Sequence, residues 1–323
     1  MPKLSRRDAL SRFGRAAAVL GGSAAVGVAL WDRDGVAREG AGQQARTRDY
    51  RVQDDRPTLP QLVIAKTSTD PEVLTRAAVD GLGGMARFVA RGDVVAIKPN
   101  IGWDRTPVQA ANTNPRVVAT LVRMALDAGA KRVIVADSSC NEASRSFQRS
   151  GIWRAAHDAG AEVILPADHR FRTIRLGGEV LHEWPIFRPV IDADKIINAP
   201  VVKHHKLAKL TGAMKNWYGL LGGRRNRLHQ NIDVSIADLA TFLQPTLTVV
   251  DATRVLMRNG PQGGNIADTK EVNQVIATLD QVAADAYACE LIGARREDIG
   301  YLDIGERRGL GTKTWEDLRR AEV

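Results

Sequence analysis

Residues 94–139 read VVAIKPNIGWDRTPVQAANTNPRVVATLVRMALDAGAKRVIVADSS, and this stretch decides the fold. A short run of β-branched and apolar residues opens it at 94–98, and a second run follows at 132–136. Between the two runs, apolar residues recur at helical spacing after Asn114-Pro115, which is a favourable helix start. The order strand, helix, strand is typical of parallel β-sheets, whose strands need a crossover connection.

The same alternation extends in both directions from this unit. Further short apolar runs lie at 62–66, 162–165, 195–199 and 247–250. The pattern predicts helices over 71–90, 142–160 and 269–294, and a short amphipathic surface helix over the final segment WEDLRRAEV, 315–323. We therefore expect an α/β fold with a largely parallel sheet and helices on both faces.

The N-terminal 37 residues are typical of a targeting segment. A basic part is followed by an apolar run of about fifteen residues, too short and mild for a membrane span. The pair Arg6-Arg7 resembles a twin-arginine (Tat) export signal. We expect the Tat machinery to export the protein to a bacterial periplasm, with the segment either cleaved or kept as an anchor. No further stretch is apolar enough to cross a membrane.

The rest of the chain divides into two parts. Residues 38–60 are polar and aperiodic and are interpreted as a linker, and residues 61–323 as one α/β domain. The net charge of +9 favours anionic ligands, but aromatic residues are only 5% and no nucleic-acid-binding motif occurs, so a nucleic-acid partner is not expected. Cys140 and Cys289 are expected to be small buried residues. Two cysteines cannot hold an all-cysteine iron–sulfur cluster.

Ionisable residues follow four of the predicted strands. The runs end in Lys98, with Asn100 two residues later, in Asp137, in Lys203-His204-His205 and in Asp251. Ligands of parallel sheets bind beyond the carboxyl ends of the strands. We therefore expect these groups to converge on one site. The alternative is that they serve only as helix caps and turn residues.

The segment 198–231 is the centre of that predicted site. It contains seven Lys or Arg residues and no acid. Thr211 is expected to cap a helix whose first turns carry Lys215 and Asn216. Its arginines, Arg224, Arg225 and Arg227, are interpreted as a solvated rim. Asn114, at the start of another helix, either binds an anion together with the free amides there or acts as a cap alone.

Six motifs in order carry a resemblance to a known family: IKPN (97–100), TNP (113–115), VADSS (135–139), NAPVVKHHKLAKLTGAMKN (198–216), GPQGG (260–264) and LDQVAADAYACELIG (279–293). The set resembles the bacterial and archaeal DUF362 family, a domain of unknown function. The family's central motif commonly reads Lys-Thr-His, so His205 matches the histidine by position. Many relatives carry a four-cysteine ferredoxin segment, which this chain lacks. A distant similarity to lactate-racemase-like proteins implies an α/β fold with a His/Lys site, but it does not imply that this chain carries a nickel cofactor.

Three functions follow from these features. In the first, the protein is an exported enzyme: Lys98, Lys203 and Lys215 hold a small anionic substrate, and His204 or His205 moves protons. Asp137 or Asp251 would orient a histidine or position the substrate, and Asn100, Asn114 and Asn216 would complete the binding site. In the second, His205 and His229, with Asp137 or Asp251, bind a divalent metal such as zinc, iron or nickel. In the third, the protein is a non-catalytic accessory of an exported redox complex, with a redox protein as its partner.

Overall fold

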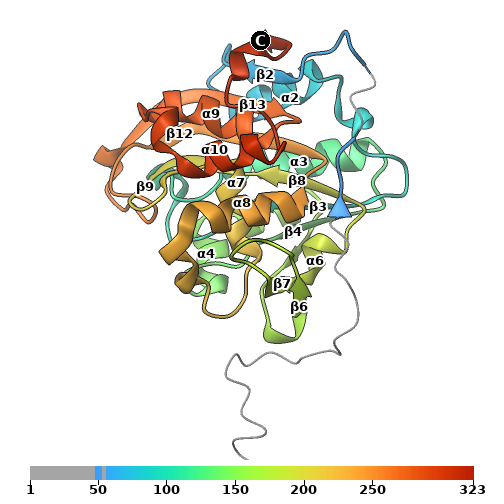
Figure 1. The fold of residues 1–323 in the computed structure, drawn as a ribbon. Helices are drawn as coiled ribbons and strands as arrows, with labels where there is room; N and C mark the ends of the chain where they lie inside the picture. The colour runs from blue at the N-terminus through green and yellow to red at the C-terminus, as the bar shows by residue number, and fades with distance from the viewer. Residues whose placement is uncertain (1–47, 53–55) are drawn as a thin grey trace, which may run out of the picture. The chain divides into compact units, whose positions relative to one another are not determined.

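The structure is a computed structural model, which describes residues 48–52 and 56–323. The predicted signal segment lies outside these residues, as does most of the predicted linker. Within them, one sheet contains the strands β2 (Leu62–Ala65), β3 (Val94–Pro99), β4 (Arg132–Ala136), β5 (Glu162–Ile164), β8 (Lys195–Ala199), β9 (Val201–His205), β10 (Lys209–Thr211), β12 (Leu247–Leu256), β13 (Thr269–Thr278) and β14 (Arg320–Glu322) (Figure 1).

The sheet is mixed but largely parallel. Its order is β14-β2-β13-β12-β8-β3-β4-β5, with β9 paired to the second half of β12 and β10 paired to β9. The run from β12 through β8, β3 and β4 to β5 is parallel throughout. Strand β13 is antiparallel to both of its neighbours, β12 and β2, and β10 is antiparallel to β9. The predicted α/β class is thereby confirmed.

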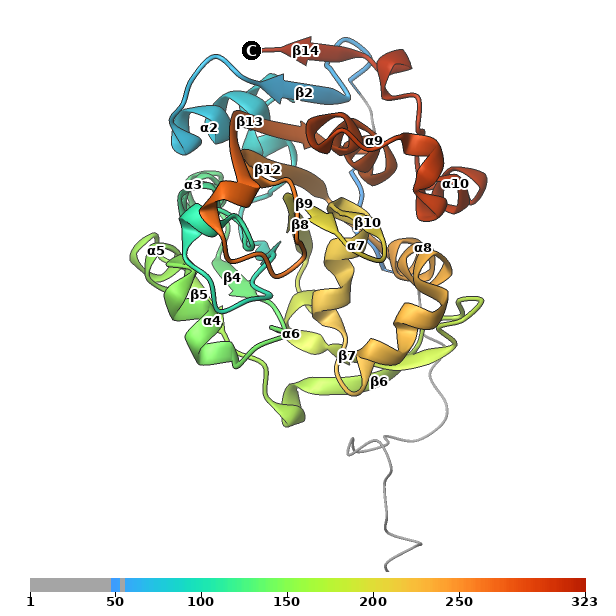
Figure 2. The ribbon, with the colours of Figure 1, turned by 90° about the vertical axis from the view of Figure 1, so that its left-hand side faces the viewer.

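Helices cover both faces of the sheet, as Figure 2 shows edge-on. One face carries α2 (Pro71–Gly81), α3 (Pro115–Asp127), α4 (Ala143–Arg149) and α5 (Ile152–Asp158). The other carries α6 (Arg188–Ile191), α7 (Ala213–Asn216), α8 (Ile232–Phe242), α9 (Gln281–Ile292) and α10 (Gly300–Arg307). Side chains alternate between the faces along each strand: Val95 and Ile97 pack towards the first helical layer and Ala96 towards the second. By the same alternation, Lys98 faces the layer that contains α7.

Two small sheets complete the described part of the chain. Strand β1 (Arg48–Asp49) pairs in parallel with β11 (Leu243–Gln244), and β6 (Phe171–Arg175) forms an antiparallel hairpin with β7 (Glu183–Phe187). A 3-10 turn, Trp217–Leu220, follows α7 directly. No helix of residues 48–52 and 56–323 combines the length and the apolar character needed to cross a membrane.

The predicted helix over 269–294 was wrong in its first half. Residues 269–278 form β13, and α9 begins only at Gln281, where Asp280 accepts hydrogen bonds from the first free amides. Val272, Val275 and Ile276 are β-branched, and β13 is placed between two other strands, so sheet pairing decides the conformation.

The predicted helix over 315–323 was also wrong. Residues Trp315–Asp317 make one 3-10 turn, after which β14 pairs in parallel with β2. The predicted helix over 142–160 is divided into α4 and α5 at Gly151, whose φ of 74° lies in the left-handed region. The predicted helix over 71–90 ends at Gly81.

Candidate functional site

Lys98 and Asp137 form a buried ion pair at the carboxyl ends of β3 and β4. The Lys98 Nζ lies 2.6 Å from the Asp137 Oδ1, and both side chains are almost fully buried. Asp137 also accepts the backbone N–H of Ile101 through Oδ2, at 2.6 Å. Burial lowers the pKa of Lys98, and the negative charge of Asp137 opposes that shift. Two of the four predicted strand ends therefore meet directly.

Asn216 of α7 connects this ion pair to the neighbouring strand. Its Nδ2 donates to the backbone oxygen of Lys98, at 3.0 Å, and to Oδ1 of Asn198 in β8, at 2.8 Å. Its Oδ1 accepts from the Lys98 Nζ and from the Asn100 Nδ2, each at 3.1 Å. Lys98 and Asn198 are register partners in the parallel pair of β3 and β8. The amide of Asn216 thus fixes α7 across the ends of two strands.

Lys203 supplies a second buried ammonium group. It lies in β9, 1% exposed, and its Nζ donates to Oδ1 of Asn100, at 2.9 Å, and to the backbone oxygen of Ala111. Among the described residues it has no acidic partner in an ion pair. Burial lowers the pKa of Lys203 to about 7, and repulsion from Lys215 acts in the same direction. Its charge therefore changes close to neutral pH.

Lys215 is the third buried lysine and belongs to α7. Its side chain is 8% exposed, and its Nζ lies 4.4 Å from the centroid of the Tyr218 ring. Within the described chain it has neither a hydrogen-bond acceptor nor an acidic partner. Burial lowers the pKa of Lys215 to about 8, and the guanidinium of Arg225 adds repulsion. The face of the Tyr218 ring stabilises the ammonium form.

The position of α7 is set by a carboxylate from a distant helix. Asp285 of α9 is fully buried and accepts the backbone N–H groups of Ala213 and Met214, the latter at 3.0 Å. Burial raises the pKa of Asp285 to about 7. The predicted capping role of Thr211 was wrong, because Thr211 belongs to β10 and Gly212 occupies the cap position without a side-chain bond.

The two adjacent histidines point to opposite sides of β9. His205 lies on the same side as Lys203 and is 5% exposed, and its Nδ1 accepts the backbone N–H groups of Leu207, at 3.2 Å, and Ala208, at 3.1 Å. The ring proton is therefore assigned to Nε2. Burial and then the nearby lysines lower the pKa of His205 to about 2, so the ring is a neutral donor rather than a base. The Nδ1 of His204 instead accepts the backbone N–H of Gly260, at 3.2 Å.

His229, the other predicted metal ligand, stacks on His205. The ring centroids lie 6.2 Å apart with an interplanar angle of 14°, and the rings of Tyr218 and His229 form a T-shaped pair with centroids 5.9 Å apart. No group of three or more His, Cys, Asp or Glu side chains that could hold a metal ion occurs in the described ranges. Burial lowers the pKa of both rings, repulsion from Lys215 adds to this, and the Lys215 charge also opposes a metal cation. Metal binding by His205 and His229 stays a prediction.

Arg225 and Cys140 belong to the site although the sequence did not indicate either one. Arg225, interpreted as rim, donates from Nη1 to the backbone oxygens of Ser138, at 2.8 Å, and Tyr218, at 3.1 Å, and from Nη2 to the Cys140 Sγ, at 3.3 Å. The expectation that Cys140 is buried was wrong, because it is exposed, whereas Cys289 is buried. A thiolate at Cys140 would raise the pKa values of all three lysines. Its place just beyond the strand end at Asp137 was the signal that could have identified it.

Asp251 and Asn114 are hydrogen-bonded to each other and, within the described chain, not to the lysines of the site. The Asp251 Oδ2 accepts the backbone N–H of Asn114 at 2.7 Å, and its Oδ1 accepts the N–H and the hydroxyl of Thr253. The Asn114 side chain accepts the N–H of Arg116 and caps α3. Burial raises the pKa of Asp251. In the described chain, neither side chain bonds to a lysine of the site, so both support the loop before α3.

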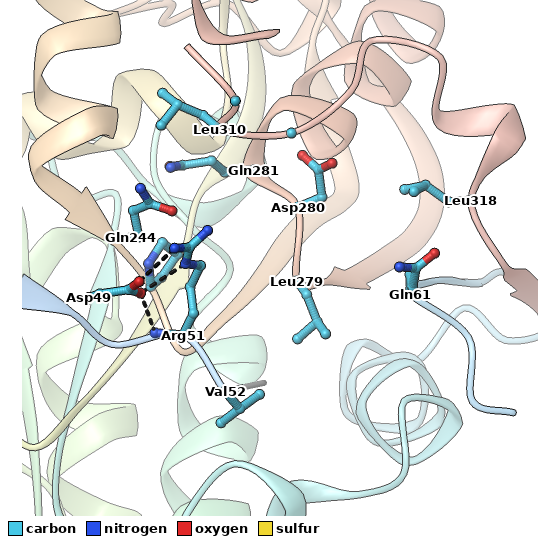
Figure 3. A pocket seen from close by; sticks show the side chains of 13 residues that line it. Asp49, Arg51, Val52, Gln61, Gln244, Leu279, Asp280, Gln281, Leu310 and Leu318 are labelled. Atoms are coloured by element: carbon cyan, nitrogen blue, oxygen red, sulfur yellow. Dashed lines mark hydrogen bonds and ion pairs between the residues drawn. The ribbon is translucent and has the colours of Figure 1, made fainter. Parts of the chain in front are cut away.

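A cavity of about 610 Å³ lies at the opposite edge of the sheet. Figure 3 shows it between the segment of Asp49 and Arg51, the residues before β12, and the N-terminus of α9. Its charged groups are already engaged: Asp49 pairs with Arg51, and Asp280 accepts backbone N–H groups of α9 and of Thr312. The buried lysines and His205, whose pKa values are lowered by burial, lie at the carboxyl ends of the strands instead, and there we place the candidate site.

Comparisons with known proteins show a family, a relative and a solved structure to which this chain is similar. Residues 95–290, which include all three lysines, match the model of a family described as a domain of unknown function, DUF362. Over 243 residues the chain is 25% identical to the thylakoid-associated protein sll1697 of Synechocystis sp., a match that covers 73% of this chain and 74% of that protein. Among solved structures, the lactate racemase apoprotein from Thermoanaerobacterium thermosaccharolyticum matches with a TM-score of 0.42 and 13% identity. That match covers 74% of this chain and 58% of the racemase chain.

Proposed function

This chain belongs to the DUF362 family, whose function is unknown, and we propose a function from the site itself. The protein is an enzyme that binds a small anionic substrate at Lys203 and Lys215. One observation carries the proposal: two ammonium groups that repel each other are buried in the described chain without an acidic partner for either. Burying an ammonium costs several kcal/mol unless an opposite charge compensates it. A bound anion would supply that charge.

The neighbouring groups suit an anion as well. The Lys98–Asp137 pair is neutral overall, and Asn216 and Asn100 use their amides to hold the lysines in place. His205, with its proton on Nε2, would donate to an anion oxygen rather than remove a proton. Lys203, whose pKa of about 7 lies near neutrality, is the group best suited to give and take a proton.

Binding of a divalent anion is expected to raise the melting temperature saturably. Sulfate and malonate are titrated against sodium chloride at matched ionic strength, with thermal unfolding as the readout. Lys203→Met and Lys215→Met are expected to lose the stabilisation. Lys215→Met is also expected to start from a higher melting temperature, because it removes a buried charge that makes no hydrogen bond within the described chain.

Lys206→Met and Lys209→Met are the matched controls, because both lysines are exposed on the same segment. They are expected to keep the full response to sulfate. Equal stabilisation by chloride, or an unchanged sulfate response in Lys203→Met and Lys215→Met, would contradict anion binding at this site.

Anion affinity is expected to fall as the pH rises. An anion favours the ammonium form, so binding takes up a proton once the pH passes about 7 for Lys203 and about 8 for Lys215. Sulfate should therefore bind best at or below pH 7, and its affinity should decrease by up to about tenfold per pH unit for each lysine that must be protonated. Calorimetric titration across this range measures the slope, and a flat profile would exclude the lysines as the anion's partners.

We also propose that the protein acts outside the cytoplasm, from the twin-arginine pattern of residues 1–37. Changing Arg6 and Arg7 together to lysine is expected to move the full chain from the periplasmic to the cytoplasmic fraction of a bacterial host. Immunoblots of the fractions measure the distribution. The matched control changes Arg12 and Arg15 to lysine, and export that persists at the same level in the Arg6/Arg7 variant would refute the proposed route.

A further inference from the structure

The three buried lysines differ in what their nitrogen atoms contact. The Lys98 Nζ is paired with Asp137 and hydrogen-bonded to Asn216 and to the backbone oxygen of Pro99. The Lys203 Nζ is hydrogen-bonded to Asn100 and to the backbone oxygen of Ala111. Within residues 48–52 and 56–323, the Lys215 Nζ has no hydrogen-bond acceptor and contacts the face of Tyr218. Of these amines, Lys215 alone can form a new bond without first breaking an existing one.

The surroundings of Lys215 favour the free amine. The side chain is nine-tenths buried on the rigid turn of α7, which Asp285 and Asn216 hold from two sides. Burial and the nearby guanidinium of Arg225 lower the pKa of Lys215 to about 8. Desolvation next to another cation is a known way to make a lysine nucleophilic near neutral pH.

We propose that Lys215 condenses with the carbonyl group of a small oxo acid to form an imine. This inference rests on the proposed anion-binding function and specifies its substrate class. The carboxylate of the oxo acid pairs with Lys203, and the carbonyl carbon is presented to the Lys215 Nζ. An acid with a carbonyl group is the ligand class that uses both features of the site: the positive charge and the free amine.

The step balances without an oxidant or a reductant. The neutral amine nitrogen adds to the carbonyl carbon, and the carbonyl oxygen takes up a proton. The nitrogen loses a proton to give a carbinolamine. The hydroxyl then takes up a second proton, the C–O bond breaks, and water leaves as the C=N bond forms, giving a protonated imine that can release its proton. Lys203, which titrates near neutrality, is placed to exchange these protons, and the Nε2–H of His205 can donate to the departing oxygen.

Reductive trapping tests this inference on the full chain. The protein is incubated with pyruvate, oxaloacetate or acetoacetate at pH 7.5 with sodium cyanoborohydride, and the intact mass is measured. An adduct at one site is expected, heavier by the mass of the probe less one oxygen atom, and peptide mapping of the wild-type protein should place it on Lys215. At that pH a lysine with a pKa of about 8 has about two-hundredfold more free amine than an ordinary exposed lysine.

Two controls separate charge from covalent chemistry. Lys215→Arg keeps the positive charge and should lose the adduct, whereas Lys206→Arg should keep it. Acetone, a carbonyl compound without an acidic group, should label Lys215 far less than acetoacetate does.

Labelling spread evenly over Lys206, Lys209 and other exposed lysines would overturn the imine. So would the absence of an adduct from a wild-type protein that sulfate still stabilises, a result that would leave the anion-binding proposal standing. Absence of both the adduct and the sulfate response would overturn both proposals. The mapping uses the wild-type chain, so the test does not depend on whether a variant folds.

Discussion

Replacing Lys98 with methionine is expected to lower the free energy of unfolding by about 3–5 kcal/mol, because the change leaves the Asp137 carboxylate buried without its partner. Lys98 is fully buried, and its Nζ makes hydrogen bonds to Asn216 and to the backbone oxygen of Pro99 in addition to the ion pair. Methionine has a similar length and fills the space, so the loss is electrostatic rather than a cavity. Urea unfolding followed by circular dichroism measures the change.

A second substitution in the same pair identifies the cause. Asp137→Asn in the Lys98→Met background removes the unpaired charge and keeps an oxygen that can accept the backbone N–H of Ile101. The double variant is expected to recover at least half of the lost stability, which a double-mutant cycle quantifies. Lys131→Met, at an exposed lysine, is the matched control and should be near neutral. A double variant no more stable than Lys98→Met would show that the orphaned carboxylate is not the cause.

Replacing Gly219 with alanine is expected to cost about 3 kcal/mol or more and to abolish the response to sulfate. An added Cβ would enter the space of the Asp137 carboxylate and would lie 2.5 Å from the Lys98 Nζ. The turn cannot simply withdraw, because the backbone oxygen of Gly219 accepts the N–H of Ser138 at 2.8 Å. Either the ion pair separates or the Trp217–Leu220 turn moves, and Arg225, which donates to the Tyr218 oxygen of that turn, moves with it.

Gly102→Ala is the matched control for this change. An added Cβ there would lie 3.6 Å from the Asn100 Oδ1, an ordinary van der Waals distance, although the position is also close to the site. Thermal unfolding and sulfate titration of both variants give the comparison. Equal behaviour of Gly219→Ala and Gly102→Ala would refute the close packing of the turn on the ion pair.

The sequence predicted the strands that carry the site because those strands are buried on both faces. Runs such as 94–98, 132–136 and 195–199 are continuous and β-branched, and their ends fall where the structure has them to within one residue. Parallel pairing then brings Lys98 and Asp137 together, since both follow neighbouring strands at the same edge. This part of the site depends only on where neighbouring strands end, and local sequence patterns predict those ends well.

The remaining contacts join residues that no local pattern connects. Asp285 caps α7 from another helix, and Arg225 reaches back to the loop after β4, so propensity could not reveal either contact. Asp251 follows the predicted strand at 247–250, but β12 continues through this residue. Its carboxylate accepts the backbone N–H of Asn114 and does not join the lysines. Strand β13 was missed because its apolar residues run directly into α9 without a clear boundary.

Strand β14 has a consequence for the order of folding. It pairs in parallel with β2, so the first and last strands of the ten-stranded sheet along the chain lie side by side (Figure 2). The two strands are far apart in the sequence, and their pairing cannot begin until β14 has left the ribosome. Until then, the outer edge of β2 lacks its strand partner, so this edge of the sheet closes late in folding.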